Sequence, residues 1–144
     1  MKIRPSRITD LAFIVRLSET AFHRYGSYGN TLGANFLRPQ VTTRIAEDDP
    51  GPSGFVMLQR KEEAVELVAI AVSTSQRNHR VGTELLRAAI QWARGVGAAR
   101  LELHTGVDNI RGLQLFKSAG FESTETVASY YPEGQTAVRM RLTL

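Results

Sequence analysis

The segment from Val72 to Leu86 has the residue types of a phosphate-binding loop. It reads Val-Ser-Thr-Ser-Gln-Arg-Asn-His-Arg-Val-Gly-Thr-Glu-Leu-Leu, which is the end of an apolar strand, a polar loop and the start of an amphipathic helix. Such a loop presents backbone N–H groups and the positive end of a helix dipole, which suits a pyrophosphate. Because Gly82 alone is weak evidence, an ordinary connection between a strand and a helix fits the spacing equally well.

Three elements are expected to position this loop. Residues 64–72 are nearly all apolar and β-branched, which predicts a central strand covered on both faces. Apolar residues at helical spacing predict a helix from Gly82 to about Arg94, ended by Gly95-Val96-Gly97. Period-two alternation predicts a further strand at 100–104, so a parallel crossover joins the two strands through the helix.

The rest of the chain adds antiparallel strands and two more helices. Asp10 is expected to cap a helix at Leu11–Ala21, and Asp108 a helix at Asn109–Ser118. Residues 22–40, rich in Gly, Asn and aromatics, are expected to form a loop with one helical turn and to hold substrate selection. The remaining predicted strands are 2–4, the hairpin of 42–46 and 55–60 around a turn at 47–54, 121–127 and 136–142.

The polar loop resembles the acetyl-CoA-binding motif of the GCN5-related N-acetyltransferases (GNAT), Gln/Arg-x-x-Gly-x-Gly/Ala. The segment Arg77-Asn78-His79-Arg80-Val81-Gly82 matches the motif at its first and last positions. Arg80 stands where the family usually has its first Gly, so close approach of the backbone to a pyrophosphate is less favoured there. Its side chain could add a charged phosphate contact or simply face solvent.

Four further stretches agree with the same family in order and spacing, so the resemblance covers nearly the whole chain. Residues 67–72 are similar to its fourth strand, 101–105 to its fifth, and Asn109 with 115–121 to its Asn…Leu-Tyr-x-x-x-Gly-Phe signature. The tail 130–140 resembles, more weakly, the RimI-type branch, which acetylates protein N-termini. The family implies one N-acetyltransferase domain over residues 1–144, an α/β fold with a mixed, mostly antiparallel sheet of six to seven strands and about four helices.

The resemblance assigns the co-substrate acetyl-CoA to the fourth strand and the following loop. Residues 70–72 would pair with the pantetheine as an added strand does, with the Val72 N–H facing the thioester carbonyl, and residues 78–83 would hold the pyrophosphate. Core packing is the alternative for the apolar residues, and starting a helix is the alternative for Asn109. The implied cofactor-binding residues are Ile70, Ala71, Val72, Arg77, Asn78, His79, Arg80, Val81, Gly82, Thr83, Asn109 and Phe116.

Two residues compete to be the general base when an amine attacks the thioester. Glu66 falls where histone-type members place a glutamate, and His104 falls where RimI-type members place their candidate on the fifth strand. A glutamate flanked by Val65 and Leu67 is a candidate for desolvation, whereas an imidazole titrates near pH 6.5 without any perturbation. Glu66 is slightly preferred as the base. The alternative for Glu66 is a solvated carboxylate at a strand edge, and the alternative for His104 is a structural histidine.

The family pattern does not assign a general acid in this sequence. The tyrosine that many members place on the fourth helix is Phe116 here, which has no proton to give. Tyr130 and Tyr131 are candidates by their place in the tail, with aromatic packing as the alternative. Water is a third candidate, because a thiol with a pKa near 8.5 is not a poor leaving group.

The pKa of the acceptor bears on the substrate. An α-amino group, with a pKa of about 7.7–8.0, is roughly a tenth neutral at pH 7, whereas a lysine near 10.4 is under a thousandth neutral. A weak base is therefore enough for a protein or peptide N-terminus, which is the expected acceptor. The alternatives are a small-molecule amine and a non-catalytic acyl-CoA-binding module.

Composition excludes several other classes of function. The 144 residues carry a net charge of +4 and contain no Cys, so a thiol nucleophile and a thiolate zinc site are ruled out, and no metal is expected at three dispersed histidines. No apolar run approaches the roughly 18–20 residues that span a bilayer, and no secretory pattern is present, so a cytoplasmic protein is expected. The cations are spread along the chain, which does not favour nucleic acid. Members of the family often dimerise through late strands, so a homodimer is one expectation.

Overall fold

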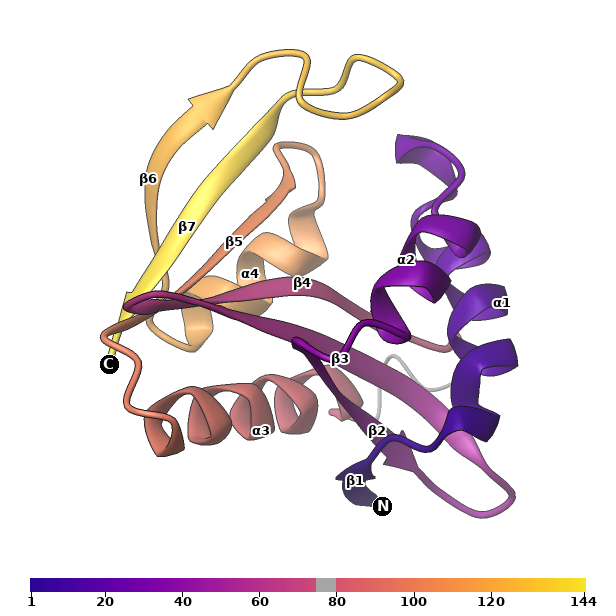
Figure 1. The fold of residues 1–144 in the computed structure, drawn as a ribbon. Helices are drawn as coiled ribbons and strands as arrows, with labels where there is room; N and C mark the ends of the chain where they lie inside the picture. The colour runs from indigo at the N-terminus through magenta and orange to yellow at the C-terminus, as the bar shows by residue number, and fades with distance from the viewer. Residues whose placement is uncertain (75–79) are drawn as a thin grey trace.

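A computed structural model describes residues 1–74 and 80–144. These residues form a seven-stranded sheet in the order β1-β2-β3-β4-β5-β7-β6, with helices on both faces (Figure 1). The strands are β1 (Lys2–Pro5), β2 (Val41–Glu47), β3 (Pro52–Lys61), β4 (Ala64–Val72), β5 (Arg100–Gly106), β6 (Glu122–Val127) and β7 (Ala137–Thr143). The helices are α1 (Leu11–Ala21), α2 (Gly29–Phe36), α3 (Val81–Gly95) and α4 (Ile110–Ser118), with 3-10 turns η1 (Ile8–Asp10) and η2 (His23–Tyr25).

The sheet is mixed and mostly antiparallel, which confirms the expected fold class. Neighbouring strands run antiparallel except β4 and β5, which are parallel and joined through α3. Parallel neighbours need such a crossover, because a short turn cannot return the chain to the same end of the sheet. β4 lies at the centre of the seven strands, as its apolar composition predicts.

Two apolar cores lie on opposite faces of the sheet. The first joins α3 and α4 to β2–β5 and β7, and α3 contributes Val81, Leu85, Ala89 and Ala93 at a spacing of four residues, all without measurable exposure. The second joins α1 and α2 to β2, β3 and β4 only. The face of β5 and β7 that turns away from α3 and α4 therefore has no helix core against it among the described residues. None of the described helices is long and apolar enough to cross a membrane.

β4 changes its alternation at a bulge. Its register with β3 skips Val68, and Leu67 packs into the core of α3 whereas Ala69 packs into the core of α1. In a regular strand residues 67 and 69 would face the same way, so the extra residue rotates the second half of β4. Glu66, which comes before the bulge, alternates with the α3-facing Val65 and Leu67 and lies on the opposite face.

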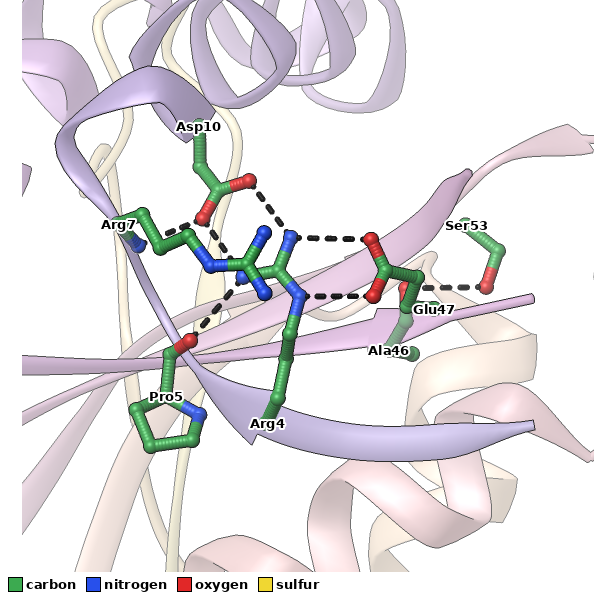
Figure 2. A network of polar contacts seen from close by, with 7 residues as sticks. All are labelled: Arg4, Pro5, Arg7, Asp10, Ala46, Glu47 and Ser53. Atoms are coloured by element: carbon green, nitrogen blue, oxygen red, sulfur yellow. Dashed lines mark hydrogen bonds and ion pairs between the residues drawn. The ribbon is translucent and has the colours of Figure 1, made fainter. Parts of the chain in front are cut away.

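A buried ion network ties the start of the chain to the sheet (Figure 2). The Arg4 guanidinium donates to both Asp10 oxygens at 2.9 Å and also to the Glu47 carboxylate. Asp10 was expected to cap α1, but it makes no side-chain cap bond to that helix, and instead its Oδ2 accepts from the Arg7 N–H at 2.7 Å. The bidentate pair explains this correction, since two hydrogen bonds between oppositely charged groups outweigh one bond from the same carboxylate to a neutral backbone N–H.

Two other sequence expectations need correction. The stretch 22–40 holds a full helix, α2, and not a single turn. Its glycines disfavoured that prediction, but a Cβ at Gly33 would lie 3.0 Å from Val15, so close packing on α1 requires a small residue there. The turn after β2 is also shorter than expected, because β3 already begins at Pro52.

Candidate functional site

The parallel strands β4 and β5 separate soon after they begin. They pair at only three positions, ending with Glu66 opposite Glu102. β4 then continues to Val72 and β5 to Gly106, while β3 alone pairs with the second half of β4 among the described residues. A free strand edge offers N–H and C=O groups that an extended ligand can pair with, as an added strand does.

A cleft of about 700 Å³ lies beside this free edge. Its walls are the end of β4, the start of α3, the segment after α1, and α4 with its preceding loop. Val81 is an exception among the predicted cofactor residues, since it is fully buried in the core under α3. Arg77, Asn78 and His79 lie outside the described residues. The predicted cofactor residues that do line the cleft are Ile70, Ala71, Val72, Arg80, Gly82, Thr83, Asn109 and Phe116.

The first turn of α3 presents its amide end to the cleft. The first α-helical hydrogen bond runs from the Glu84 N–H to the Arg80 carbonyl, so the amides of residues 81–83 have no acceptor within the helix. Gly82 and Thr83 line the cleft at this positive end of the helix dipole. These groups fit a pyrophosphate, the ligand predicted from the loop sequence.

Arg80 adopts a backbone conformation that favours glycine. Its φ is 62° and its ψ is 18°, in the left-handed region, immediately before α3 begins. This is the position where the acetyl-CoA motif usually has its first Gly, and the conformation gives a backbone reason for that preference. The chain retains the turn with a charged side chain that is exposed at the cleft.

Asn109, not Asp108, caps α4. The Asn109 side-chain oxygen Oδ1 accepts from the Gly112 N–H at 3.2 Å, and the side-chain Nδ2 donates to the Thr105 hydroxyl at 2.9 Å. The helix-starting alternative for Asn109 is thus present in the structure. Asp108 was expected at this cap, but its carboxylate faces the segment after α1 instead.

Phe116 joins the cleft to the core. It is 3% exposed, and its ring meets the Phe121 ring edge-on with centroids 5.7 Å apart. Phe116 lines the cleft, so this position offers an apolar wall and no proton.

The four predicted catalytic residues gather next to the gap between β4 and β5. The His104 ring stacks on Tyr130 with centroids 4.5 Å apart and planes 10° from parallel. Tyr130 in turn meets Tyr131 edge-on at 5.0 Å. Glu66 lies close enough to influence the protonation of both His104 and Tyr130, and its Oε2 is 2.6 Å from the Lys61 ammonium.

The protonation of these groups follows from their surroundings. Partial burial and the Arg139 cation lower the pKa of His104 below its ordinary value of 6.5, so its ring is neutral near pH 7. Burial raises the pKa of Tyr130, and also that of Tyr131, so both phenols keep their protons. A neutral imidazole can accept a proton, which is what a general base must do.

Tyr25 and Asp108 were not predicted as site residues. Tyr25 is 6% exposed, and its hydroxyl donates to Asp108 Oδ1 at 2.9 Å, while Arg24 donates to Asp108 Oδ2 at 2.8 Å. Burial, together with the neighbouring carboxylate, raises the pKa of Tyr25 to about 12. The aromatic composition of 22–40 was the sequence signal, but it did not single out this tyrosine.

Tyr25 connects the cleft to the predicted catalytic residues. It lines the cleft, and its ring lies 4.5 Å from the ring of Tyr131. Around it the connection after α1 meets the β6–β7 connection, since Gln135 donates to the Arg24 carbonyl and a Cβ on Gly26 would lie 3.3 Å from Pro132. Both connections lie at the same end of the sheet (Figure 1).

Comparison with known proteins agrees with this geometry. The model of the acetyltransferase (GNAT) family matches residues 10–121. A protein of Methanocaldococcus jannaschii, described as an uncharacterized N-acetyltransferase, is 31% identical over 93 residues, which are 60% of this chain and 41% of that protein. The chain thus spans less than half the length of this relative.

Two solved structures share the fold over nearly the whole chain. The ribosomal-protein-S18-alanine N-acetyltransferase of Escherichia coli superposes with a TM-score of 0.87 at 23% identity, covering 99% of this chain and 92% of that one. An acetyltransferase of Bacillus subtilis solved in complex with CoA gives a TM-score of 0.84 at 22% identity, with coverage of 99% and 98%.

Proposed function

This chain belongs to the GNAT family of acetyltransferases, and from that premise we propose that it transfers an acetyl group from acetyl-CoA to the amino group of a protein or peptide N-terminus. The single observation that carries the proposal is the early separation of β4 and β5. One side of the gap opens on the cleft with the α3 amides, and the other side holds His104, Tyr130 and Glu66.

The cleft accommodates acetyl-CoA in an extended form. The free edge at Ile70–Val72 would pair with the pantetheine, and the amides of Gly82 and Thr83 would hold the pyrophosphate with the Arg80 guanidinium beside them. Phe116 would pack against the apolar part of the arm. This arrangement aims the thioester at the gap, where the acceptor amine enters from the other face.

We assign the base to His104 and a supporting role to Glu66. The Glu66 carboxylate is already ion-paired to Lys61, whereas the His104 ring is neutral and stacked in place by Tyr130. His104 takes the proton from the ammonium, the freed amine attacks the thioester carbonyl, the C–N bond forms and the C–S bond breaks. The negative charge of Glu66 stabilises the imidazolium. As the C–S bond breaks, the nitrogen loses its second proton, which passes through water to the departing thiolate.

The same environment supports an N-terminal acceptor. A histidine whose pKa is lowered is a weak base, and it suits an amine that is already partly neutral at pH 7, as an α-amino group is and a lysine is not. Within residues 1–74 and 80–144, no helix core lies against the face of β5 and β7 next to His104, which leaves room for a polypeptide to extend beyond the site.

The test is acetyl-CoA-dependent mass gain on a pooled peptide library with free N-termini. A matched pool has blocked N-termini and the same side chains, including free lysines. Gain in the free pool alone supports the proposal, and gain in both pools overturns the restriction to N-termini. If neither pool gains mass, the acceptor proposal fails; turnover of small amines then indicates a metabolite acceptor, and binding of acetyl-CoA without turnover indicates an acyl-CoA-binding module.

A further inference from the structure

His104 and Arg139 are direct cross-strand neighbours on the open face of the sheet. The antiparallel register of β5 and β7 pairs them, and the next pair on the same face is Glu102 with Arg141. Directly opposed residues have Cβ atoms about 4.5–5.5 Å apart, so a charge on one side chain acts strongly on the other. This face carries the predicted base, and no helix core from the part of the chain that the structure describes lies against it.

Arg139 is held in place from both sides. Its Nη2 donates to Glu102 on β5, and its Nη1 donates to Glu125 on β6 at 3.3 Å. Glu102 also accepts from Arg100, so alternating charges run across three strands. An arginine fixed by two carboxylates keeps its guanidinium in one position, unlike a free surface side chain that samples many rotamers.

Five groups surround the His104 ring. The Tyr130 ring covers one side from the β6–β7 connection, and Arg139 faces it from β7. Three carboxylates favour the protonated ring: Glu66 from β4, Glu102 from β5 and Glu125 from β6. Burial of the ring and, after it, the Arg139 cation outweigh these carboxylates in the described part of the chain, since the pKa of His104 is lowered.

We propose that Arg139 is a positioning residue for the reaction: anchored by Glu102 and Glu125, it places a positive charge beside His104 and keeps the imidazole neutral until the acceptor arrives. The proposal rests on the proposed function, in which His104 takes one proton from the acceptor ammonium and then releases it to water. Arg139 itself contacts no reacting atom and gives up no proton.

The test compares R139M with R139K and with the matched control R141M, which removes a cation from the same face of β7 one pair farther along. The first readout is the NMR titration of the His104 ring without substrates, its signal being assigned by its loss in H104Q. The second readout is kcat against pH at saturating acetyl-CoA and acceptor peptide. Melting curves check that each variant folds.

In R139M we expect the His104 ring to titrate at a higher pH than in wild type. The ratio of kcat at pH 6 to kcat on the high-pH plateau should then be about two- to threefold lower than in wild type. R139K and R141M should leave both readouts near wild type. An unchanged His104 titration in folded R139M overturns the inference whatever the activity does. A shifted His104 titration with an unchanged pH profile of kcat also overturns the inference. In that case His104 is not the general base, and the assignment of the base in the proposed function fails.

Discussion

The Tyr25 hydroxyl donates a 2.9 Å hydrogen bond to the Asp108 carboxylate and thereby joins the segment after α1 to the loop before α4. A Cβ on Gly106 would lie only 2.3 Å from the same hydroxyl. β5 must therefore end in glycine for the Tyr25 ring to fit. On its other side the ring meets Tyr131. Tyr25 therefore fixes the wall between the cleft and the predicted catalytic residues around Tyr131.

Removal of this hydroxyl should affect the acceptor more than the co-substrate. For Y25F we expect a loss of about 1 kcal/mol in the free energy of unfolding, because one partly buried hydrogen bond disappears. The KM for the acceptor should rise severalfold while the KM for acetyl-CoA stays within twofold. Steady-state kinetics with each substrate varied in turn measures both constants.

Y28F is the matched control, since the Tyr28 ring also belongs to this region but its hydroxyl has no hydrogen-bond partner in the described part of the chain. It should leave stability and both KM values unchanged. Equal effects of Y25F and Y28F would mean that ring packing, and not the bond to Asp108, fixes the wall.

R80G should stabilise the protein by about 0.5–1 kcal/mol. Arg80 is left-handed at φ 62°, a conformation that glycine adopts without steric cost. R80G should also raise the KM for acetyl-CoA, because a cation at the cleft is lost. R80K retains a cation there and should leave this KM near the wild-type value. Urea unfolding and initial rates measure the two effects.

R94G is the control for R80G, since Arg94 is an exposed residue in the last turn of the same helix. There glycine should destabilise by about 1 kcal/mol. If both variants lose stability, Arg80 does not hold the left-handed conformation in solution.

Local patterns predicted the framework of the site, and contacts between distant residues decided its details. The apolar run of β4 and the four-residue spacing of α3 are local signals, so their positions could be read directly from the sequence. Asp10 and Asp108 have the chemistry of helix caps, yet Asp10 binds Arg4 and Asp108 binds Arg24, 84 residues earlier. Cap chemistry shows that a carboxylate can accept a hydrogen bond but not which donor the fold brings to it.

The candidate site divides in the same way. His104 and Tyr130 could be predicted from family motifs, but their stacking depends on where the β6–β7 connection lies. Tyr25 belongs to no motif, and its close contact with Gly106 depends on where β5 ends in its pairing with β7. The bulge at Val68, which sets the faces of β4, leaves no mark in an apolar sequence.

H104Q should remove most of the turnover. General-base catalysis contributes about 10²–10⁴-fold, and for an α-amine that is already partly neutral we expect a loss near the lower limit, about 100-fold in kcat at pH 7. Because burial and Arg139 lower the pKa of His104, the acid limb of the wild-type profile should lie below pH 6.5. In H104Q the remaining rate should follow only the titration of the acceptor amine.

E66Q is the comparison for H104Q. It should lower kcat less than tenfold and keep the wild-type acid limb, since Glu66 is ion-paired to Lys61 and, in the proposed mechanism, only stabilises the imidazolium. The reverse pattern, with the larger loss in E66Q, would return the base to Glu66, the residue that the sequence slightly favoured.

D10N should destabilise the fold in a way that depends on pH. Asp10 is 5% exposed, and its hydrogen bonds to Arg4 hold the pKa of its carboxyl below the usual 3.8 (Figure 2). At pH 7 we expect a loss of about 2–3 kcal/mol, since the variant leaves part of a buried guanidinium charge uncompensated while Glu47 still pairs with it.

The sign of the pH dependence follows from the lowered pKa. The stabilisation by ionised Asp10 is fully present above the unfolded-state value, and it is lost as the pH falls through the lower folded-state value. Wild type and D10N should therefore differ equally at pH 7 and pH 5, and the difference should shrink as the pH falls below 3.8. Urea unfolding at each pH measures this, and E122Q, which changes an exposed carboxylate on β6, is the control. A difference between wild type and D10N that does not shrink at all below pH 3.8 would mean that the carboxyl stabilises through its shape and neutral hydrogen bonds, and not through its charge.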